Sequence, residues 1–272
     1  MKLSISRQPR ITYKSSQEIA KIRAAGKVVS IVLAALRDAV APGVDTLKLD
    51  HLAFQIISDH GGTPSFMHHR AGERIYYHSI CASLNDEVVH GIPREDRKLR
   101  EGDLISLDVG VKLNGFHGDS AITVPVGEVS AEATRLLEVT KESLWQGIRA
   151  VRWKGHVADI SAAIQRYVES DGYSLVRELA GHGIGRQLWE PPSVFNYVDS
   201  DHDNPPLLEG MTIAIEPMVN VGKPEVINLA DGWTVSTADG SLSAHFEHTL
   251  AITRGGCEVL TLGPHDPGPS GA

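Results

Sequence analysis

Residues 104–125 constrain the fold most strongly. They read LISLDVGVKLNGFHGDSAITVP, with Asn114-Gly115 at the centre. An Asn-Gly pair between two apolar segments is a strong signal for a two-residue turn in an antiparallel hairpin. Two long strands joined by this turn are therefore expected here, and the turn fixes which residues face each other.

Two carboxylates share one face of this predicted hairpin. The register places Asp108 opposite Ala121 and Asp119 opposite Gly110, so the two aspartates are diagonal neighbours. Diagonal side chains lie about 7–8 Å apart at most, a separation that one or two metal ions can span. In isolation, the same pattern also fits two solvent-exposed aspartates on an antiparallel sheet.

Three more candidate ligands lie in apolar or glycine-rich segments. Glu216 ends the apolar part of MTIAIEPM, Glu247 lies in SAHFEHTLAIT, and His182 lies in GHGIG. Ionised carboxylates are costly in such segments unless an opposite charge compensates them. Four carboxylates and one imidazole suit Mn, Fe(II) or Co, with Zn as a further option, and the charge balance favours two ions. This pattern indicates a metal-assisted hydrolase.

Helical patterns occur twice, each time before a strand-rich stretch. The first pair starts at a capping box in residues 15–18 and continues with a helix over residues 46–59. The second pair covers residues 130–152 and 157–169. The strand-rich stretches cover residues 79–127 and 177–261. The order predicts an α+β fold with two related helix-helix-strand halves, about residues 13–128 and 129–263, in a single catalytic domain. Residues 1–12 and the Pro/Gly-rich residues 264–272 are expected to be tails, the second disordered.

Composition narrows the class of partner. The net charge of −8 argues against nucleic acid as the main ligand, and no apolar run approaches the length of a membrane span. The N-terminal residues lack the apolar core of a signal peptide. Cys81 and Cys257 are then expected to be reduced thiols in a cytoplasmic protein.

Five strings in this order resemble type I methionine aminopeptidase, and the likeness covers about residues 11–263. They are CASLNDEVVHGIP, GDLISLDVGVKLNGFHGDSA, GHGIGR, GMTIAIEPM and DGWTVSTADGSLSAHFEHTLAIT. The resemblance implies a pita-bread fold, in which two pseudo-symmetric halves hold a dinuclear metal site within a curved antiparallel sheet. It also implies a monomer, associated with the ribosome, that removes the initiator methionine from nascent chains and peptides.

The resemblance also implies roles for individual residues. The metal ligands are Asp108, Asp119, His182, Glu216 and Glu247. Glu216 is also implied as the proton shuttle, and His90 as the catalytic histidine that contacts the substrate. The implied substrate-binding residues are His90, Cys81, Trp233, Leu188, Trp189 and Tyr76.

Two departures from the family pattern lie beside the expected metal centre. The family usually has a second active-site histidine seven residues after His182, where this chain has Trp189. An indole can only donate a hydrogen bond, whereas a neutral imidazole can also accept one. The segment of residues 67–78 is about four residues longer than usual. Its His68 and His69 are expected in a polar, mobile loop rather than as extra metal ligands.

Two other functions remain compatible with these residues. One is an aminopeptidase of the same fold that cleaves before proline. The other is a low-activity or repurposed homologue, which Trp189 favours but the five intact candidate ligands do not.

Overall fold

The computed structural model describes residues 10–264 and 266. Within these residues the chain forms four α-helices: α1 (Ser16–Ala39), α2 (Thr46–Asp59), α3 (Ala131–Ala150) and α4 (Val157–Ser170). None of them is both long enough and apolar enough to cross a bilayer. Each predicted helix is present, within a few residues of its expected bounds.

The helices begin where the sequence provides caps. Before α1, the Ser15 hydroxyl accepts from the Glu18 backbone N–H at 3.3 Å, and the Glu18 carboxylate accepts from the Ser15 N–H at 3.0 Å. This reciprocal pair is the predicted capping box. At α3 the cap is a single contact, in which the Ser130 hydroxyl accepts from the Ala133 N–H at 3.1 Å.

The strands of the described residues form five sheets, and every pair is antiparallel. The four-stranded sheet contains β1 (Thr63–Pro64), β6 (Leu104–Leu113), β4 (Ile80–Leu84) and β7 (Phe116–Pro125). The five-stranded sheet contains β10 (Glu190–Val194), β9 (Gly181–Gly183), β11 (Thr212–Ile215), β16 (His248–Thr253) and β17 (Gly256–Val259). The smaller sheets contain β15 (Ser243–His245), β12 (Met218–Asn220) and β8 (Ser174–Leu175); β13 (Val226–Asn228), β14 (Val235–Thr237) and β5 (Glu87–Val89); and β2 (Arg70–Ala71) and β3 (Arg74–Ile75).

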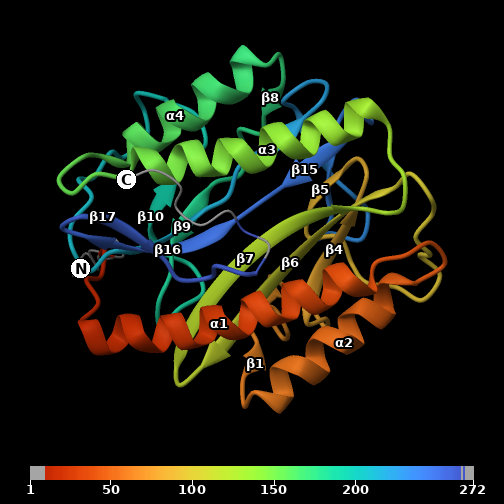
Figure 1. Ribbon diagram of the computed structural model, residues 1–272, viewed down its shortest axis with the longest axis horizontal. Coiled ribbons are helices and arrows are strands. Elements are labelled where there is room, and N and C mark those ends of the chain that lie inside the picture. The colour runs from red at the N-terminus through yellow and green to blue at the C-terminus, as the bar shows by residue number, and fades with distance from the viewer. Residues whose placement is uncertain (1–9, 265, 267–272) are drawn as a thin grey trace, which may run out of the picture.

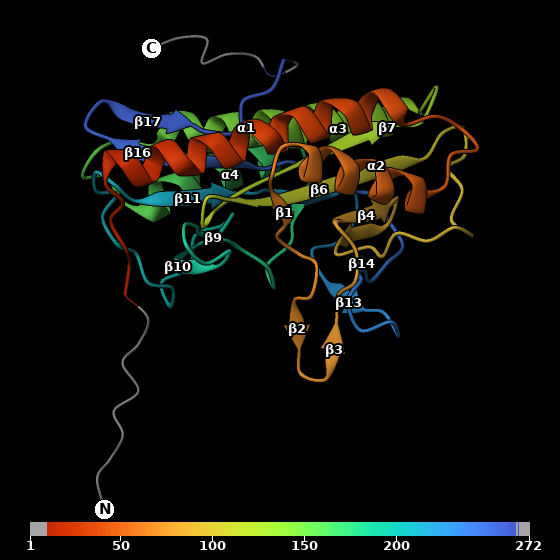
Figure 2. The ribbon, with the colours of Figure 1, turned by 90° about the horizontal axis from the view of Figure 1, so that it is seen from below.

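The helices cover one side of the sheets. Helices α1 and α2 lie over one half and α3 and α4 over the other (Figure 1). In the view from below, α1 and α3 form an outer layer, whereas β9, β10, β13, β14 and the β2–β3 hairpin lie on the opposite side (Figure 2). The helix pair and sheet of each half repeat the same order, as the sequence predicts.

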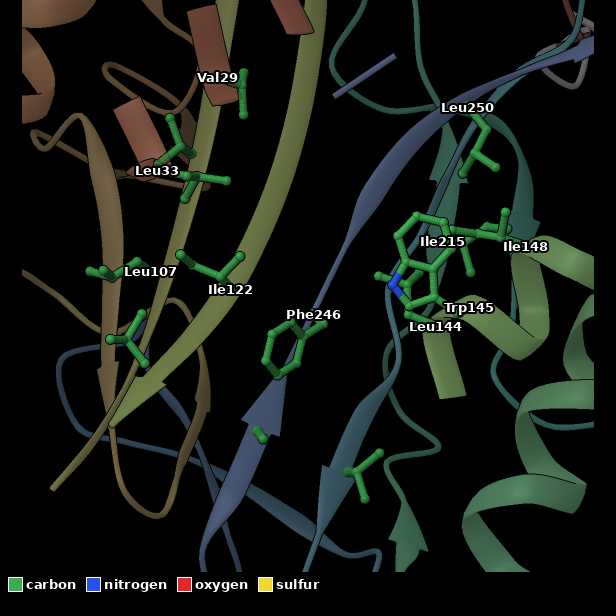
Figure 3. Packing of buried hydrophobic residues seen from close by; sticks show 14 of the residues in the cluster. Val29, Leu33, Leu107, Ile122, Leu144, Trp145, Ile148, Ile215, Phe246 and Leu250 are labelled. Carbon is green, nitrogen blue, oxygen red and sulfur yellow. The ribbon is translucent and has the colours of Figure 1, made fainter. Parts of the chain in front are cut away.

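Apolar side chains join the two halves. Leu107 and Ile122 of the first half belong to the same buried cluster as Trp145 and Ile215 of the second. Phe246 lies between these two groups in the core (Figure 3). The halves therefore share this large cluster, which holds the sheets of one half against those of the other.

The hairpin of β6 and β7 has the predicted register. Asp108 pairs with Ala121 and Gly110 pairs with Asp119. The turn residue Asn114 has φ 53°, a positive value that asparagine tolerates better than most residues. Both aspartates therefore face the same side of the sheet, opposite the apolar residues that pack under α1.

Most of the predicted tails, residues 1–9, 265 and 267–272, lies outside the described residues. Described residues at both ends of the chain nevertheless contact the rest of the structure. Thr12 donates to the Glu190 carboxylate at 2.6 Å, and an Asp266 carboxylate oxygen lies 3.7 Å from His248 Nε2.

The capping box predicts a measurable loss of stability. Ser15→Ala removes an acceptor for an N–H at the start of α1, so the free energy of unfolding should fall by about 1 kcal/mol. Urea denaturation followed by circular dichroism measures this change. Ser16→Ala, at the exposed next position, is the matched control. Equal midpoints for the two variants would contradict the assigned cap.

Candidate metal centre and active site

All five predicted metal ligands line one cavity. Its volume is about 510 Å³, and its walls include Asp108, Asp119, His182, Glu216 and Glu247. The ligands come from β6, β7, β9, the residue after β11 and the residue before β16. Elements from both halves of the chain thus meet at this cavity.

Three of these side chains have the spacing of a metal site. Ligand atoms of Asp119, His182 and Glu247 all lie within 4.8 Å of one another. His182 Nε2 is 3.6 Å from Glu216 Oε1 and 4.0 Å from Asp119 Oδ2. A single ion between them can reach several of these atoms with a small adjustment of side chains.

The His182 ring is held by its own backbone region. Its Nδ1 lies 2.8 Å from the carbonyl oxygen of Gly183, to which it can donate. This contact leaves Nε2 directed at the carboxylates as a lone-pair donor. Metal-ligating histidines are commonly oriented in this way.

Several buried oxygen atoms in the cavity have no partner. Within the described residues, Asp108 Oδ1, Asp119 Oδ1 and Glu247 Oε1 are buried and accept no hydrogen bond. Buried acceptors are rarely left unsatisfied, because each costs the loss of its hydration. All three residues line one cavity, so the donor set fits cations in it.

Burial and mutual repulsion change how these carboxyl groups titrate in the ion-free chain. Burial, with a contribution from Glu216, raises the pKa of Asp108 to about 7. Burial and the neighbouring Asp108 raise the pKa of Asp119 well above its usual range. Burial and Asp119 do the same for Glu247. The cluster therefore holds protons at neutral pH until another positive charge displaces them.

Hydrogen bonds between the halves hold the backbone at the two deepest carboxylates. The Glu247 N–H donates to the Ala121 carbonyl at 2.9 Å. The Thr249 hydroxyl donates to the Asp119 carbonyl at 2.8 Å and lies 3.1 Å from the Asp119 N–H. β7 is thereby pinned against β16 at the position where each half contributes a carboxylate.

Glycines let strand β9 approach its neighbours. A Cβ at Gly181 would collide with the Ala214 carbonyl oxygen, and one at Gly183 with the Pro191 carbonyl oxygen. Only glycine therefore fits on either side of His182. This is the physical reason for the GHG string around the imidazole.

One wall of the cavity is apolar and aromatic. Tyr76, Cys81 and Trp233 line it, with the Tyr76 and Trp233 rings 5.3 Å apart in an edge contact. The Tyr76 hydroxyl donates to the Ile80 carbonyl at 2.8 Å. Cys81 pairs with Asp108 across β4 and β6, so the apolar wall adjoins the carboxylates.

His90 also lines the cavity, at a position after β5 where its φ is 61°. Burial lowers the pKa of its imidazole, against the opposing effect of Glu216. A neutral imidazole beside the carboxylates can donate one hydrogen bond to a bound molecule.

The two residues after Gln187 lie at different depths: one lines the cavity and the other is buried behind its wall. Trp189 lines the cavity, with 45% of its surface exposed. Leu188 does not line the cavity in the described part of the chain. It is buried behind the wall, in the cluster of Tyr76 and Cys81.

Sequence reasoning missed two imidazoles of the cavity. His245 is buried, and its Nε2 lies 3.6 Å from Glu216 Oε2 without a hydrogen-bond partner. Strand alternation, which puts His245 on the same face as Glu247 two residues later, is the signal that could have found it. His69 lines the cavity too, although its segment was expected to form a polar loop. That segment contains the short strands β2 and β3 instead.

Comparisons with known proteins agree with this geometry. Residues 20–254 match the model of metallopeptidase family M24. The chain is 46% identical over 251 residues to "Methionine aminopeptidase 1" of Bacillus subtilis (strain 168), covering 92% of this chain and 99% of that protein. It is 43% identical over 260 residues to "Methionine aminopeptidase" of Escherichia coli (strain K12), covering 96% and 97%.

A solved structure agrees as well. The crystal structure of methionine aminopeptidase from Rickettsia prowazekii matches with a TM-score of 0.88 and 40% identity, covering 93% of this chain and 100% of that chain. The chain belongs to metallopeptidase family M24. Its fold is the pita-bread fold of that family, as the sequence predicted, and membership implies binding of divalent metal.

The raised pKa values predict that metal stabilisation depends on pH. At pH 5 the folded, ion-free cluster holds protons that a metal must displace, whereas at pH 8 more of its carboxylates are ionised. The rise in Tm on adding Mn²⁺ should therefore be larger at pH 8 than at pH 5. Buried histidines such as His117 have a lowered pKa, so they change the stability of the fold with pH in the opposite direction. This contribution is present in both the loaded and the stripped protein, and it cancels when the two are compared at the same pH.

Differential scanning fluorimetry of stripped and Mn²⁺-loaded protein measures this difference. Asp119→Asn is the control, because it removes a central carboxylate and should abolish most of the shift at both pH values. An equal rise in Tm at pH 5 and pH 8 in the unaltered chain would contradict the inference that the ion-free carboxyl groups hold protons at pH 5.

Proposed function

We propose that this chain is a metal-dependent aminopeptidase that removes the N-terminal methionine from nascent proteins and peptides. One observation supports this function above the others. A single cavity joins a cluster of unpartnered carboxylates to an apolar wall, and its 510 Å³ falls within the usual range for small-ligand sites. Two relatives that are 46% and 43% identical to it along nearly their whole length carry the name methionine aminopeptidase.

We infer that the cluster holds two divalent ions, Mn, Co, Fe(II) or Zn. The ligands would be Asp108, Asp119, His182, Glu216 and Glu247. When bound, such ions activate water and polarise the scissile carbonyl. Four ionised carboxylates carry a charge that one divalent ion neutralises by half and two neutralise fully.

Glu216 is the proposed proton shuttle. Its carboxylate lies between two imidazoles, with one oxygen 3.6 Å from His182 Nε2 and the other 3.6 Å from His245 Nε2. The side chain is mostly buried but borders the cavity. In this proposal Glu216 takes a proton from water and returns it to the departing amine, with the His245 imidazole beside its second oxygen.

The remaining walls bind the substrate in this proposal. His90 donates to the carbonyl oxygen of the scissile peptide bond. Cys81, Tyr76 and Trp233 surround the methionine side chain, with Leu188 supporting them from behind. A thioether side chain suits such a wall, because it is unbranched and packs well against aromatic edges.

The partners follow from this activity. Nascent chains with N-terminal methionine are the proposed substrates, and the cytoplasm, in association with the ribosome, is the proposed site of action. We propose a monomer, because the cavity is complete within one chain: all five candidate ligands belong to it.

A peptide panel tests the specificity. Protein stripped with chelator and then given Mn²⁺ or Co²⁺ should release methionine from Met-Ala-Ser at least about 10-fold faster than it cleaves Ala-Pro-Ser or Val-Ala-Ser. Chromatography of the released amino acids measures these rates. Faster cleavage before proline would favour the proline-specific alternative. Folded protein without turnover on any metal would favour a repurposed homologue.

Alanine variants test the ligands. Asp108→Ala and Glu247→Ala should each lower metal affinity, and with it activity at limiting metal, by at least about 100-fold, because each leaves the other carboxylates without a shared ion. Elemental analysis by mass spectrometry gives the metal content and methionine release gives the activity. Glu95→Ala, at an exposed carboxylate, is the matched control. A fully active, metal-loaded variant would remove that residue from the ligand set.

A further inference from the structure

His69 and Trp189 are in contact at the solvent-exposed edge of the cavity, which we call the rim. Their ring centroids are 4.4 Å apart with the planes at 76°, an edge contact. The two residues lie far apart in the sequence, one before β2 and one before β10, and both line the same cavity. No role in the proposed reaction has been assigned to His69.

The surrounding chain holds His69 in this place. Its N–H donates to the Phe66 carbonyl at 3.0 Å, and its carbonyl accepts from the Tyr76 N–H at 2.9 Å. The β2–β3 hairpin starts at the next residue and projects on the side opposite the helices (Figure 2). Arg74 of this hairpin donates to the Gly232 carbonyl at 3.3 Å, next to Trp233.

A second aromatic contact supports the same position. The His69 ring lies 6.2 Å from the Trp233 ring, which belongs to the apolar wall. The imidazole thus lies between two indoles, one at the wall and one at the rim. It does not extend freely into solvent, as a histidine of an unconstrained loop would.

The side chains at the rim are more exposed to solvent than the carboxylates at the bottom of the cavity, which we call its base. Asp119 and Glu247 at the base are only 3% and 2% exposed, whereas Trp189 is 45% exposed and His69 is half-buried. A peptide whose first residue fills the base must leave the cavity past the rim. The rim side chains therefore meet the backbone that follows the scissile bond, a step that rests on the function proposed above.

The two rim residues offer different hydrogen bonds. A neutral imidazole donates one and accepts one, whereas an indole only donates. Burial lowers the pKa of His69, which keeps the ring neutral at pH 7. A peptide backbone presents both N–H and C=O groups, so the imidazole is the rim group that matches either of them.

We propose that His69 is a substrate-binding residue that hydrogen-bonds the peptide backbone just beyond the scissile bond, with Trp189 packing against its ring. The segment 67–78 then acts as a specificity element that selects substrates with a continuing peptide chain. Trp189 sets the orientation of the imidazole and closes the rim beside it.

Steady-state kinetics on two substrates tests this role in the metal-loaded enzyme. For Met-Ala-Ser, His69→Ala should raise KM by about 3- to 10-fold, the effect of losing one neutral hydrogen bond, with kcat changed less than about twofold. For a fluorogenic methionyl amide, which has no peptide backbone beyond the cleaved bond, KM should stay the same. His69→Gln, which keeps a donor and an acceptor, should restore most of the loss.

The neighbouring histidine provides a matched control. His68 is exposed, packs edge-on against Tyr77 and does not line the cavity. Its φ is 68°, so His68→Asn is used because asparagine tolerates that conformation. This variant should match the wild type on both substrates.

An unchanged KM for Met-Ala-Ser in His69→Ala would overturn the proposal. So would an equal loss on both substrates, since that indicates an indirect effect on the metal centre or the fold. If the wild-type enzyme releases no methionine, the proposed function fails separately. Calorimetric binding of Met-Ala-Ser to wild type and His69→Ala then decides the role of His69 without turnover, and equal affinities would reject it.

Discussion

Four carboxylates packed into one cavity create the constraint on which the rest of the structure depends. Asp119 and Glu247 are almost fully buried, and burial together with neighbouring carboxylates raises the pKa of each. No arrangement of apolar strands tolerates such a cluster when it is ionised and unpaired. Divalent cations relieve the repulsion, which links the stability of this region to its chemistry.

The two halves of the chain are arranged to hold this cluster. Each half supplies part of it, and the pinning contacts between β7 and β16 run through Ala121 and Thr249. The helices pack on the outer side, where α1 approaches β7 closely because Gly118 has no side chain; a Cβ there would collide with the Gly26 backbone. The inner side is left free for the cavity, the rim and the β2–β3 hairpin.

Local signals in the sequence were enough for much of this arrangement. Asn114-Gly115 predicted the register that places Asp108 and Asp119 on one face, and the caps predicted where the helices begin. Three parts of the site were beyond such signals. The depth of Leu188, the approach of His245 to Glu216 and the docking of His69 against Trp189 all depend on contacts between residues distant in the chain. A resemblance also gives no guidance where the chain departs from it, as it does at residues 67–78 and at Trp189.

We infer that this cluster holds two divalent ions. Anomalous diffraction at the manganese absorption edge, from crystals of the stripped protein loaded with Mn²⁺, tests it most directly. If two ions bind, two anomalous peaks about 3.5–4 Å apart will appear within the cavity that the candidate ligands line. Peaks elsewhere on the surface, or none in the cavity at saturating Mn²⁺, would contradict it.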